Sequence, residues 1–410
     1  MLLRFFALVA IGLPPEGVEV SPTTTAGQGE HSLRWRHLSS KKGDLPAPGP
    51  STQQTGAVVA DLDQDGLNDF VLSFREQPPA LVWYRRNADG WDRWVIESGD
   101  LTIEAGGAVF DIDGDGDLDL VFGADYQDNK VWWWENPCPA FHPERSWNRR
   151  LIKGAGGNQH HDQIFGDFLG TGKPQLAFWN QGDRRLLLAK IPANPRQQEP
   201  WSHDVIWEFA PPSSGRASLE GLAVEDLDGD GQLDLLAGHG WLKHRGDGLF
   251  EFIAIGGQGG RLAAGRFRND QPRPQVVIAP GDGIGPLMFY ECAGSPTDSS
   301  AWTGRKLVQR DLVHGHTLQL GDLDGDGNLD IFAAEMAKWR EQRGDLDHPG
   351  ATAWILFGDG RGSFRPTVFC VGMDFHEARV ADLDGDGDLD VLNKPYTWDA
   401  PRVDVWLQEK

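Results

Sequence analysis

The sequence predicts an all-β protein, a seven-bladed β-propeller with calcium-binding loops of the form D-x-D-x-D-G. An acidic loop flanked by short apolar runs recurs along the chain, and the spacing of roughly 40 to 60 residues fits four short strands with their connections. The composition, with 52 Gly and 26 Pro in 410 residues, is typical of a turn-rich β chain. These repeats favour one domain over the two or three that the length alone suggests.

The acidic loop is clearest at residues 322–330, where carboxylates alternate along a tight turn that Gly327 allows. Convergent carboxylates repel one another without a cation, and an all-oxygen cage suits Ca²⁺ best. The flanking runs are short, apolar and partly β-branched, which predicts strands on both sides. An EF-hand, which needs two flanking helices, is therefore not expected.

The loop occurs in five complete and two degraded copies. The degraded copies start at Asp167, where the turn survives, and at Arg266, where only the flanking apolar runs survive. Seven copies predict seven blades, with about five structural Ca²⁺ sites. The predicted calcium ligands are the first, third, fifth and ninth residues of the complete copies: Asp61, Asp63, Asp65, Asp69, Asp111, Asp113, Asp115, Asp119, Asp226, Asp228, Asp230, Asp234, Asp322, Asp324, Asp326, Asp330, Asp382, Asp384, Asp386 and Asp390.

The N-terminus resembles a short signal peptide, because Arg4 is followed by an apolar run that is too short to span a bilayer. Residues 1–31 are therefore expected to be a signal peptide and disordered leader, and residues 32–410 to form the propeller. The expected location is secreted or periplasmic, where Ca²⁺ would suit weak loop sites. A disordered cytosolic leader is the alternative interpretation.

Further strands are expected at regular offsets. Residues 33–38 are expected to form a strand that joins the last blade beside residues 364–371 and so closes the ring. Third strands are expected at 80–84, 130–134, 185–191, 249–254, 287–290, 352–357 and 402–407. Tryptophans near the fourth strands should pack between blades: Trp94, Trp147, Trp207 and Trp302. The cysteines, Cys138, Cys292 and Cys370, predict no disulfide framework and no metal site.

A second pattern lies six residues before the start of each loop. In chain order, these positions hold Thr55, Ala105, His161, Glu220, Gly260, His316 and His376. The first strand of every blade lines the axis, so these residues should form a ring at one mouth of the channel. Imidazole with a carboxylate suits a divalent transition metal such as Zn²⁺ or Mn²⁺, and His161, Glu220, His316 and His376 are its predicted ligands. A hydrated channel lined by histidines is the alternative.

The loops between second and third strands should reach the same mouth, while the acidic loops lie at the opposite one. They carry acids, bases and aromatic side chains: Asp125, Tyr126, Asn180, His239, Trp241, His244, Asp282, Glu335, Lys338, Lys394 and Tyr396. Such a mixture is typical of a carbohydrate site, where rings stack on sugar faces and polar groups bind hydroxyls. For Glu335 or Lys394, a surface ion pair is the competing interpretation.

Composition and motifs exclude several other functions. The formal net charge is −23 without a basic stripe, so no nucleic-acid partner is expected. The apolar runs predict no membrane span. The sequence lacks a G-x-S-x-G elbow, a Gly-rich phosphate loop before a helix, and an H-E-x-x-H pattern. A carbohydrate ligand or substrate is therefore the expected partner.

The acidic repeats resemble those of FG-GAP/VCBS repeat proteins, whose seven copies form a β-propeller with Ca²⁺ in the turn between the first two strands of a blade. This resemblance covers nearly everything from about residue 33 onward. It is specific for the fold and not for function, because such propellers serve adhesion, sugar binding and polysaccharide or keto-sugar lysis.

Four segments are also similar to the propeller of aldos-2-ulose dehydratase and its bacterial relatives: GNQHHDQIFGDF, VHGHTLQLGDLDGDG, FHEARVADLDGDG and NKPYTWDAPRVDVW. That family removes water from keto or anhydro sugars with metal assistance. The fungal-type enzyme carries cupin domains after its propeller, so an activity that relies on a cupin site is not expected of these residues.

The second resemblance implies a secreted, metal-dependent carbon–oxygen lyase, in which the axial metal polarises a sugar carbonyl and stabilises the resulting enolate. The candidate bases are His314, His160, His239 and Lys394, and Tyr396 or a histidine would protonate the leaving oxygen. Two other functions stay open. One is a non-catalytic carbohydrate-binding or adhesion propeller, and the other is a metal-dependent glycoside hydrolase with carboxylates drawn from Glu220, Glu335, Glu377 and Asp162.

Overall fold

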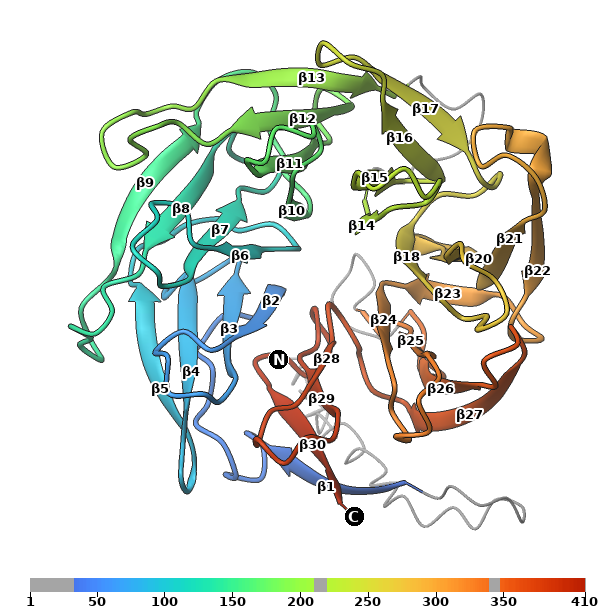
Figure 1. Cartoon of the computed structure of the whole chain (residues 1–410). Coiled ribbons are helices and arrows are strands. Elements are labelled where there is room, and N and C mark those ends of the chain that lie inside the picture. Colours follow the sequence, from blue (N-terminus) through green and yellow to red (C-terminus); the bar gives the residue numbers. More distant parts are fainter. Residues whose placement is uncertain (1–32, 210–219, 339–346, 410) are drawn as a thin grey trace, which may run out of the picture.

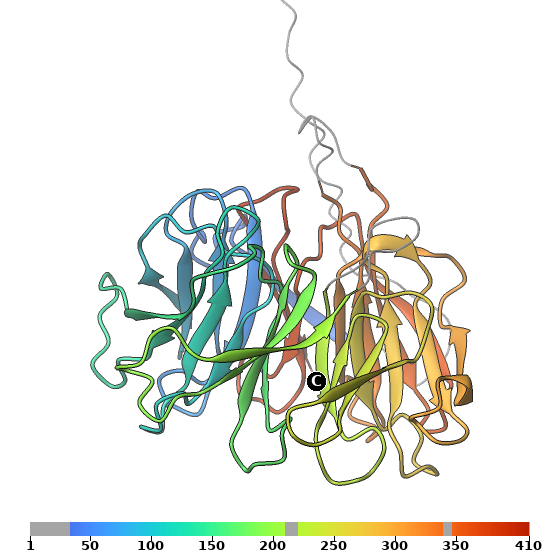
Figure 2. The same cartoon turned by 90° about the horizontal axis from the view of Figure 1, so that it is seen from above.

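The computed structural model describes residues 33–209, 220–338 and 347–409, and they form a seven-bladed β-propeller (Figure 1). Seven four-stranded antiparallel sheets surround the axis, and the ring is seen edge-on in Figure 2. The helical structure in this part of the chain is a single 3₁₀ turn, η1 (Ser299–Ala301). The predicted fold class is therefore confirmed.

The first four blades follow one another in chain order, from an inner strand at the axis to an outer strand. Blade 1 contains β2 (Gln54–Ala60), β3 (Asp69–Phe74), β4 (Leu81–Asn87) and β5 (Gly90–Glu97). Blade 2 contains β6 (Ala108–Phe110), β7 (Asp119–Gly123), β8 (Val131–Glu135) and β9 (Asn148–Lys153). Blade 3 contains β10 (Gln163–Gly166), β11 (Gln175–Asn180), β12 (Arg185–Lys190) and β13 (His203–Glu208). Blade 4 contains β14 (Leu222–Glu225), β15 (Asp234–Ala237), β16 (Gly240–His244) and β17 (Phe250–Ala254).

The last three blades contain two departures from this simple order. Blade 5 contains β18 (Arg261–Gly265), β19 (Gln275–Ala279), β21 (Met288–Cys292) and β22 (Trp302–Lys306). A separate pair, β20 (Gly281–Gly285) and β23 (Leu312–Gly315), forms a small two-stranded sheet that the sequence did not predict. Blade 6 contains β24 (Thr317–Gly321), β25 (Asp330–Ala334), β26 (Thr352–Gly358) and β27 (Phe364–Val371). Blade 7 contains β28 (Arg379–Ala381), β29 (Asp390–Asn393), β30 (Asp404–Glu409) and, as its outer strand, β1 (Arg34–Ser39).

The two ends of the chain close the ring, as predicted, but through a different neighbour. Strand β1 pairs antiparallel with β30, in register from Arg34 opposite Glu409 to Ser39 opposite Asp404. The expected partner, residues 364–371, is instead the outer strand of blade 6, where it pairs with β26. It contacts β1 through side chains, since the rings of Trp35 and Phe369 pack edge to face with centroids 5.3 Å apart. An outer strand of one blade thus faces the outer strand of the next.

Six of the seven predicted third strands are confirmed, and the exception is in blade 4. Residues 249–254 fall on β17, the outer strand, and the third strand is β16. Strands β15 and β16 are joined by a tight turn at Gly238, which has a φ of 63° that glycine adopts without strain. The turn is shorter than in the other blades, so the third strand begins earlier than its expected offset.

Tryptophans pack where neighbouring blades meet, as predicted. Trp94 of blade 1 and Trp147 of blade 2 both lie against Trp83, with centroid separations of 5.4 and 5.9 Å. Trp207 of blade 3 stacks on Phe252 of blade 4 at 3.9 Å. Trp302 is buried with residues of blades 4 and 5. Apolar burial between blades therefore makes the core a ring of clusters around the axis.

The ninth residue of each complete acidic loop is a structural cap. In blade 6, Asp330 accepts hydrogen bonds from the backbone N–H groups of Leu323 and Gly358, at 2.9 and 2.8 Å. The two degraded loops replace this aspartate by glutamine. Gln175 accepts from the N–H of Leu169 at 3.1 Å, and Gln275 accepts from that of Phe267 at 3.0 Å. The two degraded loops therefore keep this hydrogen-bonded cap although they have lost most of the carboxylates.

The carboxylates of the complete loops converge as the repeat pattern requires. Oxygens of Asp322, Asp324 and Asp330 lie within 4.8 Å of one another, as do the oxygens of three aspartates in each of three further loops. In blade 2 a basic side chain from blade 3 also reaches the loop, where Arg196 contacts Asp113 and Asp115 at 2.8 and 2.5 Å. Calcium binding at these loops remains a prediction.

The remaining predictions concern the ends and the cysteines. The expected leader, residues 1–31, lies outside the described residues. Among the described residues, Cys138, Cys292 and Cys370 are unpaired thiols, as expected. The described part of the chain forms no helix of the length and hydropathy that a membrane crossing requires.

Candidate metal centre at the channel mouth

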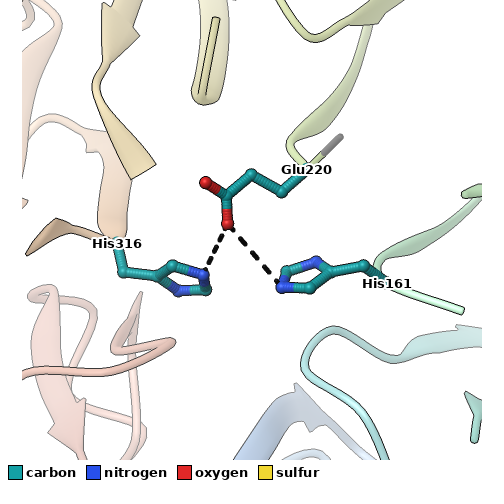
Figure 3. Close-up of side chains that lie close together, drawn as sticks. All are labelled: His161, Glu220 and His316. Atoms are coloured by element: carbon teal, nitrogen blue, oxygen red, sulfur yellow. Dashed lines mark ion pairs between the residues drawn. The ribbon is translucent and has the colours of Figure 1, made fainter. Parts of the chain in front are cut away.

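Three of the four predicted transition-metal ligands meet on the axis (Figure 3). His161, Glu220 and His316 stand just before the inner strands of blades 3, 4 and 6, so their common register points them into the channel. The Nε2 atoms of His316 and His161 lie 2.8 and 3.8 Å from the same Glu220 oxygen. One donor atom from each residue lies within 4.8 Å of the others.

The fourth predicted ligand, His376, lies beside this group. Its ring stacks on that of His316, with centroids 4.5 Å apart and planes inclined by 23°. Its Nδ1 atom lies 2.7 Å from Nζ of Lys394. The structure therefore places His376 between the three converging side chains and a buried lysine.

A layer of carboxylates and guanidinium groups holds the outer nitrogens of the two histidines. Nδ1 of His161 lies 2.7 Å from Asp162, and Nδ1 of His316 lies 3.4 Å from Glu377. Arg261 spans both carboxylates, at 2.7 Å from Asp162 and 2.9 Å from Glu377. Asp162 thus directs Nε2 of His161 toward Glu220, as carboxylates orient metal-binding imidazoles. Nδ1 of His316 lies within ion-pair distance of Glu377 but makes no hydrogen bond among the described residues.

Arg261, which completes this layer, was not predicted. It stands five residues before the start of its repeat, in register with Asp162 and Glu377. The same position holds Gly or Thr in the other blades: Gly56, Gly106, Gly221 and Thr317. This position, one residue closer to the loop than the histidines, holds two acids and one base: Asp162, Glu377 and Arg261. Comparing the repeats at this position would have revealed the layer.

The charges around the histidines determine their protonation. Burial acts to lower the pKa of His316, but the Glu220 carboxylate outweighs it and raises this pKa to about 10. Burial likewise opposes the charged form of His161, but Asp162 raises its pKa. For Glu377, burial is outweighed by Arg261 and Arg379, which hold the pKa well below its usual range. Without a metal, the group thus favours positive charge at the two imidazoles.

The buried amine of Lys394 has the opposite environment. Its side chain is fully buried, and Nζ donates to the carbonyls of Gln54 and Thr55 at 2.9 and 2.7 Å. Burial holds the pKa of Lys394 well below its usual value. Burial and the nearby lysine also lower the pKa of His376 well below its usual value. The Lys394 and His376 pair therefore favours uncharged forms, as a general base requires.

The other predicted catalytic residues divide into three groups. Tyr396 joins the centre, because its ring lies 4.8 Å from that of His376 and its hydroxyl 2.5 Å from Arg75. His314 lies on the rim, where its ring nitrogens contact the Asp282 carbonyl and the Asp347 carboxylate at 2.8 and 2.9 Å. His160 and His239 are not brought to the centre.

The rings of His160 and His239 are used in packing. His160 is fully buried, with Nε2 3.1 Å from Nζ of Lys153 and Nδ1 3.1 Å from the carbonyl of Trp179. His239 lies against Phe252 and Trp207, with ring centroids 4.9 and 6.2 Å away. His160 and His161 are consecutive residues before β10, but only His161 reaches the axis.

The rim combines fixed ion pairs with exposed apolar groups. Arg310 binds both oxygens of Glu335 at 2.5 and 2.6 Å, which supports the structural interpretation of that glutamate. Trp241 is fully buried and so belongs to the core. Tyr126, in contrast, is 58% exposed on the loop between β7 and β8, where a ring can contact a ligand.

Together, the fold and the axial group define a β-propeller with a candidate metal centre at one mouth of its channel. The chain carries FG-GAP-like repeats, since residues 61–122 and 322–392 match the model of the FG-GAP-like repeat family. No curated protein sequence matches the chain.

Several solved structures align with the chain at low sequence identity, and two of them do so with a TM-score above 0.5. The lectin BP39L from Burkholderia pseudomallei aligns with a TM-score of 0.53 and 14% identity, over 87% of this chain and 96% of its own. A lectin from Agrocybe aegerita that recognises non-reducing terminal N-acetylglucosamine aligns with a TM-score of 0.51 and 16% identity, over 79% and 81%. A rhamnogalacturonan lyase from Bacillus licheniformis gives a TM-score of 0.47 and 15% identity, over 86% and 71%.

Proposed function

We propose that the protein is a metal-dependent carbon–oxygen lyase that acts on a keto-sugar or an oxidised glycoside. The observation that carries this proposal is the convergence of His161, Glu220 and His316, with His161 oriented by the buried Asp162 carboxylate. Two imidazoles and one carboxylate form a donor set that is typical of catalytic Zn²⁺ sites, where a fourth position is left for water or substrate. The residues therefore fit a divalent transition metal such as Zn²⁺ or Mn²⁺.

A metal bound here would supply a Lewis acid that stabilises negative charge on a carbonyl oxygen of the substrate. The Lys394 and His376 pair would accept the proton from the carbon next to that carbonyl. As this C–H bond breaks, a carbon–carbon double bond forms and the β-oxygen leaves. Tyr396, whose ring lies against His376, is the candidate donor of a proton to the leaving oxygen.

The test is an assay for an unsaturated product. Protein loaded with Zn²⁺ or Mn²⁺ is incubated with keto-sugars and oxidised glycosides, and the ultraviolet absorbance of an α,β-unsaturated carbonyl is followed. Glu220→Gln should abolish turnover together with metal binding, whereas Lys394→Met should abolish turnover and retain the metal. His203→Ala, on the exposed outer strand β13, is the control. Release of reducing ends without this absorbance would instead support a glycoside hydrolase.

A non-catalytic carbohydrate-binding propeller is the second candidate. The side chains of the axial group are almost inaccessible, since His161 is 6% exposed and His316 2% exposed. Tyr126 at the same mouth is open to a ligand, and two solved structures with this fold are lectins. Glycan binding that is lost in Tyr126→Ala, in a protein that converts no sugar, would support this candidate.

The calcium loops and the location belong to the same proposal. Five loops of converging carboxylates would bind Ca²⁺ and relieve their mutual repulsion. An extracellular or periplasmic location, which the signal-like N-terminus favours, would supply both Ca²⁺ and a polysaccharide-derived substrate.

A further inference from the structure

The opposite end of the channel holds a second, chemically different space. A cavity of about 750 Å³ opens on the side of the acidic loops. Its wall is formed by the last residues of the inner strands, including β6, β10 and β28. The volume lies within the range of small-molecule sites, roughly 300 to 1,000 Å³.

The repeat register places an apolar residue at the same point of every inner strand. The residues two positions before the start of each repeat are Val59, Val109, Phe165, Val224, Ala264, Leu320 and Val380. All seven are half-buried, and four of them line the cavity: Val59, Val109, Phe165 and Val380. Four positions earlier, just before the inner strand, blades 3, 4, 6 and 7 carry histidine or glutamate. In these four blades the chain therefore runs from a polar mouth to an apolar one.

Two further features add apolar surface on one side of the cavity. The rings of Phe110 and Phe165, from blades 2 and 3, stack with centroids 4.7 Å apart. Leu233 also lines the cavity and is 41% exposed.

The exposure of Leu233 follows from the degraded loop of blade 3. The equivalent leucine of blade 6, Leu329, packs over Gly265, at the end of the inner strand of the preceding blade. In blade 3 the equivalent glycine, Gly166, is covered by the ring of Phe168. Because Phe168 occupies that place, Leu233 is left at the cavity.

Asn68 and Gln319 are among the polar side chains that line the cavity, and Gln163 adds an unsatisfied acceptor. Gln163 lines the cavity and is 6% exposed, and its Nε2 donates to the carbonyl of His160 at 2.9 Å. That bond fixes the amide orientation, which leaves Oε1 as a buried acceptor without a hydrogen-bond partner among the described residues. An unsatisfied buried acceptor favours a ligand that brings a donor.

Arg379 is the cationic side chain at the cavity, but it is already paired with a carboxylate. Arg379 lines the cavity, but its guanidinium is bound to Glu377 at 2.7 Å. The acidic loops stand at the same mouth, and the cavity wall itself includes Asp167. A negatively charged ligand is therefore disfavoured relative to a neutral one.

We propose that this cavity is a second binding site, for a small neutral amphiphile with an apolar body and one N–H or O–H donor. The apolar body occupies the space between Phe110, Phe165 and Val109. The donor binds Oε1 of Gln163 after this side chain turns toward the cavity, because the oxygen is inaccessible to solvent in the structure. The site is separated from the candidate metal centre by the layer of Arg261, Asp162 and Glu377, so it is independent of the proposed lyase activity.

A matched pair of fluorescent probes tests this site in the full chain. N-phenyl-1-naphthylamine is neutral, apolar and carries one N–H group, and 1-anilinonaphthalene-8-sulfonate is the same skeleton with a sulfonate. We expect one molecule of the neutral probe to bind per chain, with at least about tenfold higher affinity than the anionic probe. Equal binding of both probes, binding of several molecules per chain, or no binding of the neutral probe would overturn the proposal.

Variants locate the bound probe. Val109→Gln and Gln163→Leu should each weaken binding about tenfold, through lost apolar contact and a lost acceptor. If Val109→Gln does not fold, Val109→Thr replaces it, because this change adds polarity at nearly constant side-chain volume. Val368→Gln, at a 53% exposed position on the outer strand β27, is the matched control and should bind like the wild type. Unchanged affinity in a folded Val109 variant and in Gln163→Leu would contradict the assigned position.

Discussion

His161 and His316 share one arrangement, in which each ring has one nitrogen toward Glu220 and the other toward a carboxylate that Arg261 holds. A free histidine can turn its ring and change tautomer, and the hydrogen bond to Asp162 removes both freedoms from His161. The position of the histidines was predictable from the repeat, because one register applies to all blades. Arg261 was not predicted because its role appears only when carboxylates from blades 3 and 7 are brought together.

The residue that orients His161 can be tested alone. Asp162→Asn should lower the affinity for Zn²⁺ by about 10-fold to 100-fold, because an amide is a weaker partner for the imidazole Nδ1–H group. The change is measured by competition with a chelator of known affinity. Asp347→Asn, which alters a rim carboxylate beside His314, is the control. Equal affinity of Asp162→Asn and wild type would show that Asp162 does not orient a ligand.

Lys153 predicts a pH dependence of stability. This lysine is 2% exposed, and burial lowers its pKa from 10.5 to about 8. Between pH 8 and pH 10.5 the unfolded chain binds the proton and the folded chain does not, so stability should rise with pH in this window. The rise is up to about 3 kcal/mol from this one group.

The control for this effect is Lys153→Met, which has no amine to titrate. Denaturant unfolding of both proteins from pH 7.5 to pH 10.5 gives the two curves, and their difference removes the contribution of all other groups. We expect the wild type to gain stability relative to the variant as the pH rises. A constant difference would mean that the amine is solvated in the folded state.

Each blade is built from the same element, a strand, a capped acidic loop and a second strand. The cap is a carboxylate in five blades and the amide of Gln175 or Gln275 in the other two. This explains why the degraded repeats still fold as blades: the hydrogen bond to the loop backbone needs an acceptor and not a charge.

Gln175 tests this explanation. Gln175→Ala should lower the free energy of unfolding by about 1–3 kcal/mol, because the N–H of Leu169 loses its acceptor. Gln175→Asp, the residue type found in the complete loops, should lose less. Lys173→Ala, in the exposed part of the same loop, is the control, and urea denaturation measures all three. Equal losses in Gln175→Ala and Lys173→Ala would show that the cap does not stabilise the loop.

The repeat predicted the blades, the inner strands and most third strands, because the acidic loop marks the same point in every copy. It did not predict the pair β20 and β23, because these strands lie in connections within and after blade 5 and have no counterpart in the other blades as far as they are described. It misplaced residues 249–254, because a short turn at Gly238 moved the third strand forward. A prediction from the repeat describes what all blades share, so it does not predict features that occur in a single blade.

For the whole molecule, the ring is closed by pairing of the first and last strands. His37 reinforces the closure, since its ring stacks on Trp406 with centroids 4.4 Å apart and its Nε2 lies 2.8 Å from Asp404. Without β1, the apolar strand β30 would become an exposed sheet edge, which promotes association between molecules.

A chain that begins at residue 44 should therefore be less stable than one that begins at residue 33, by at least about 3 kcal/mol. It should also self-associate through β30. Thermal unfolding and size-exclusion chromatography of the two chains make the comparison. Equal stability and a monomeric shorter chain would show that blade 7 is complete with three strands.

The central claim is that one transition metal binds on the axis, and elemental analysis of the purified protein tests it most directly. After mild metal exchange, Ca²⁺ and transition metals are measured in wild type, His316→Ala and the control His203→Ala. We predict about one transition-metal ion per chain in wild type and control, none in His316→Ala, and the same Ca²⁺ content in all three. Calcium alone in all three proteins would contradict the metal centre, and with it the proposed lyase.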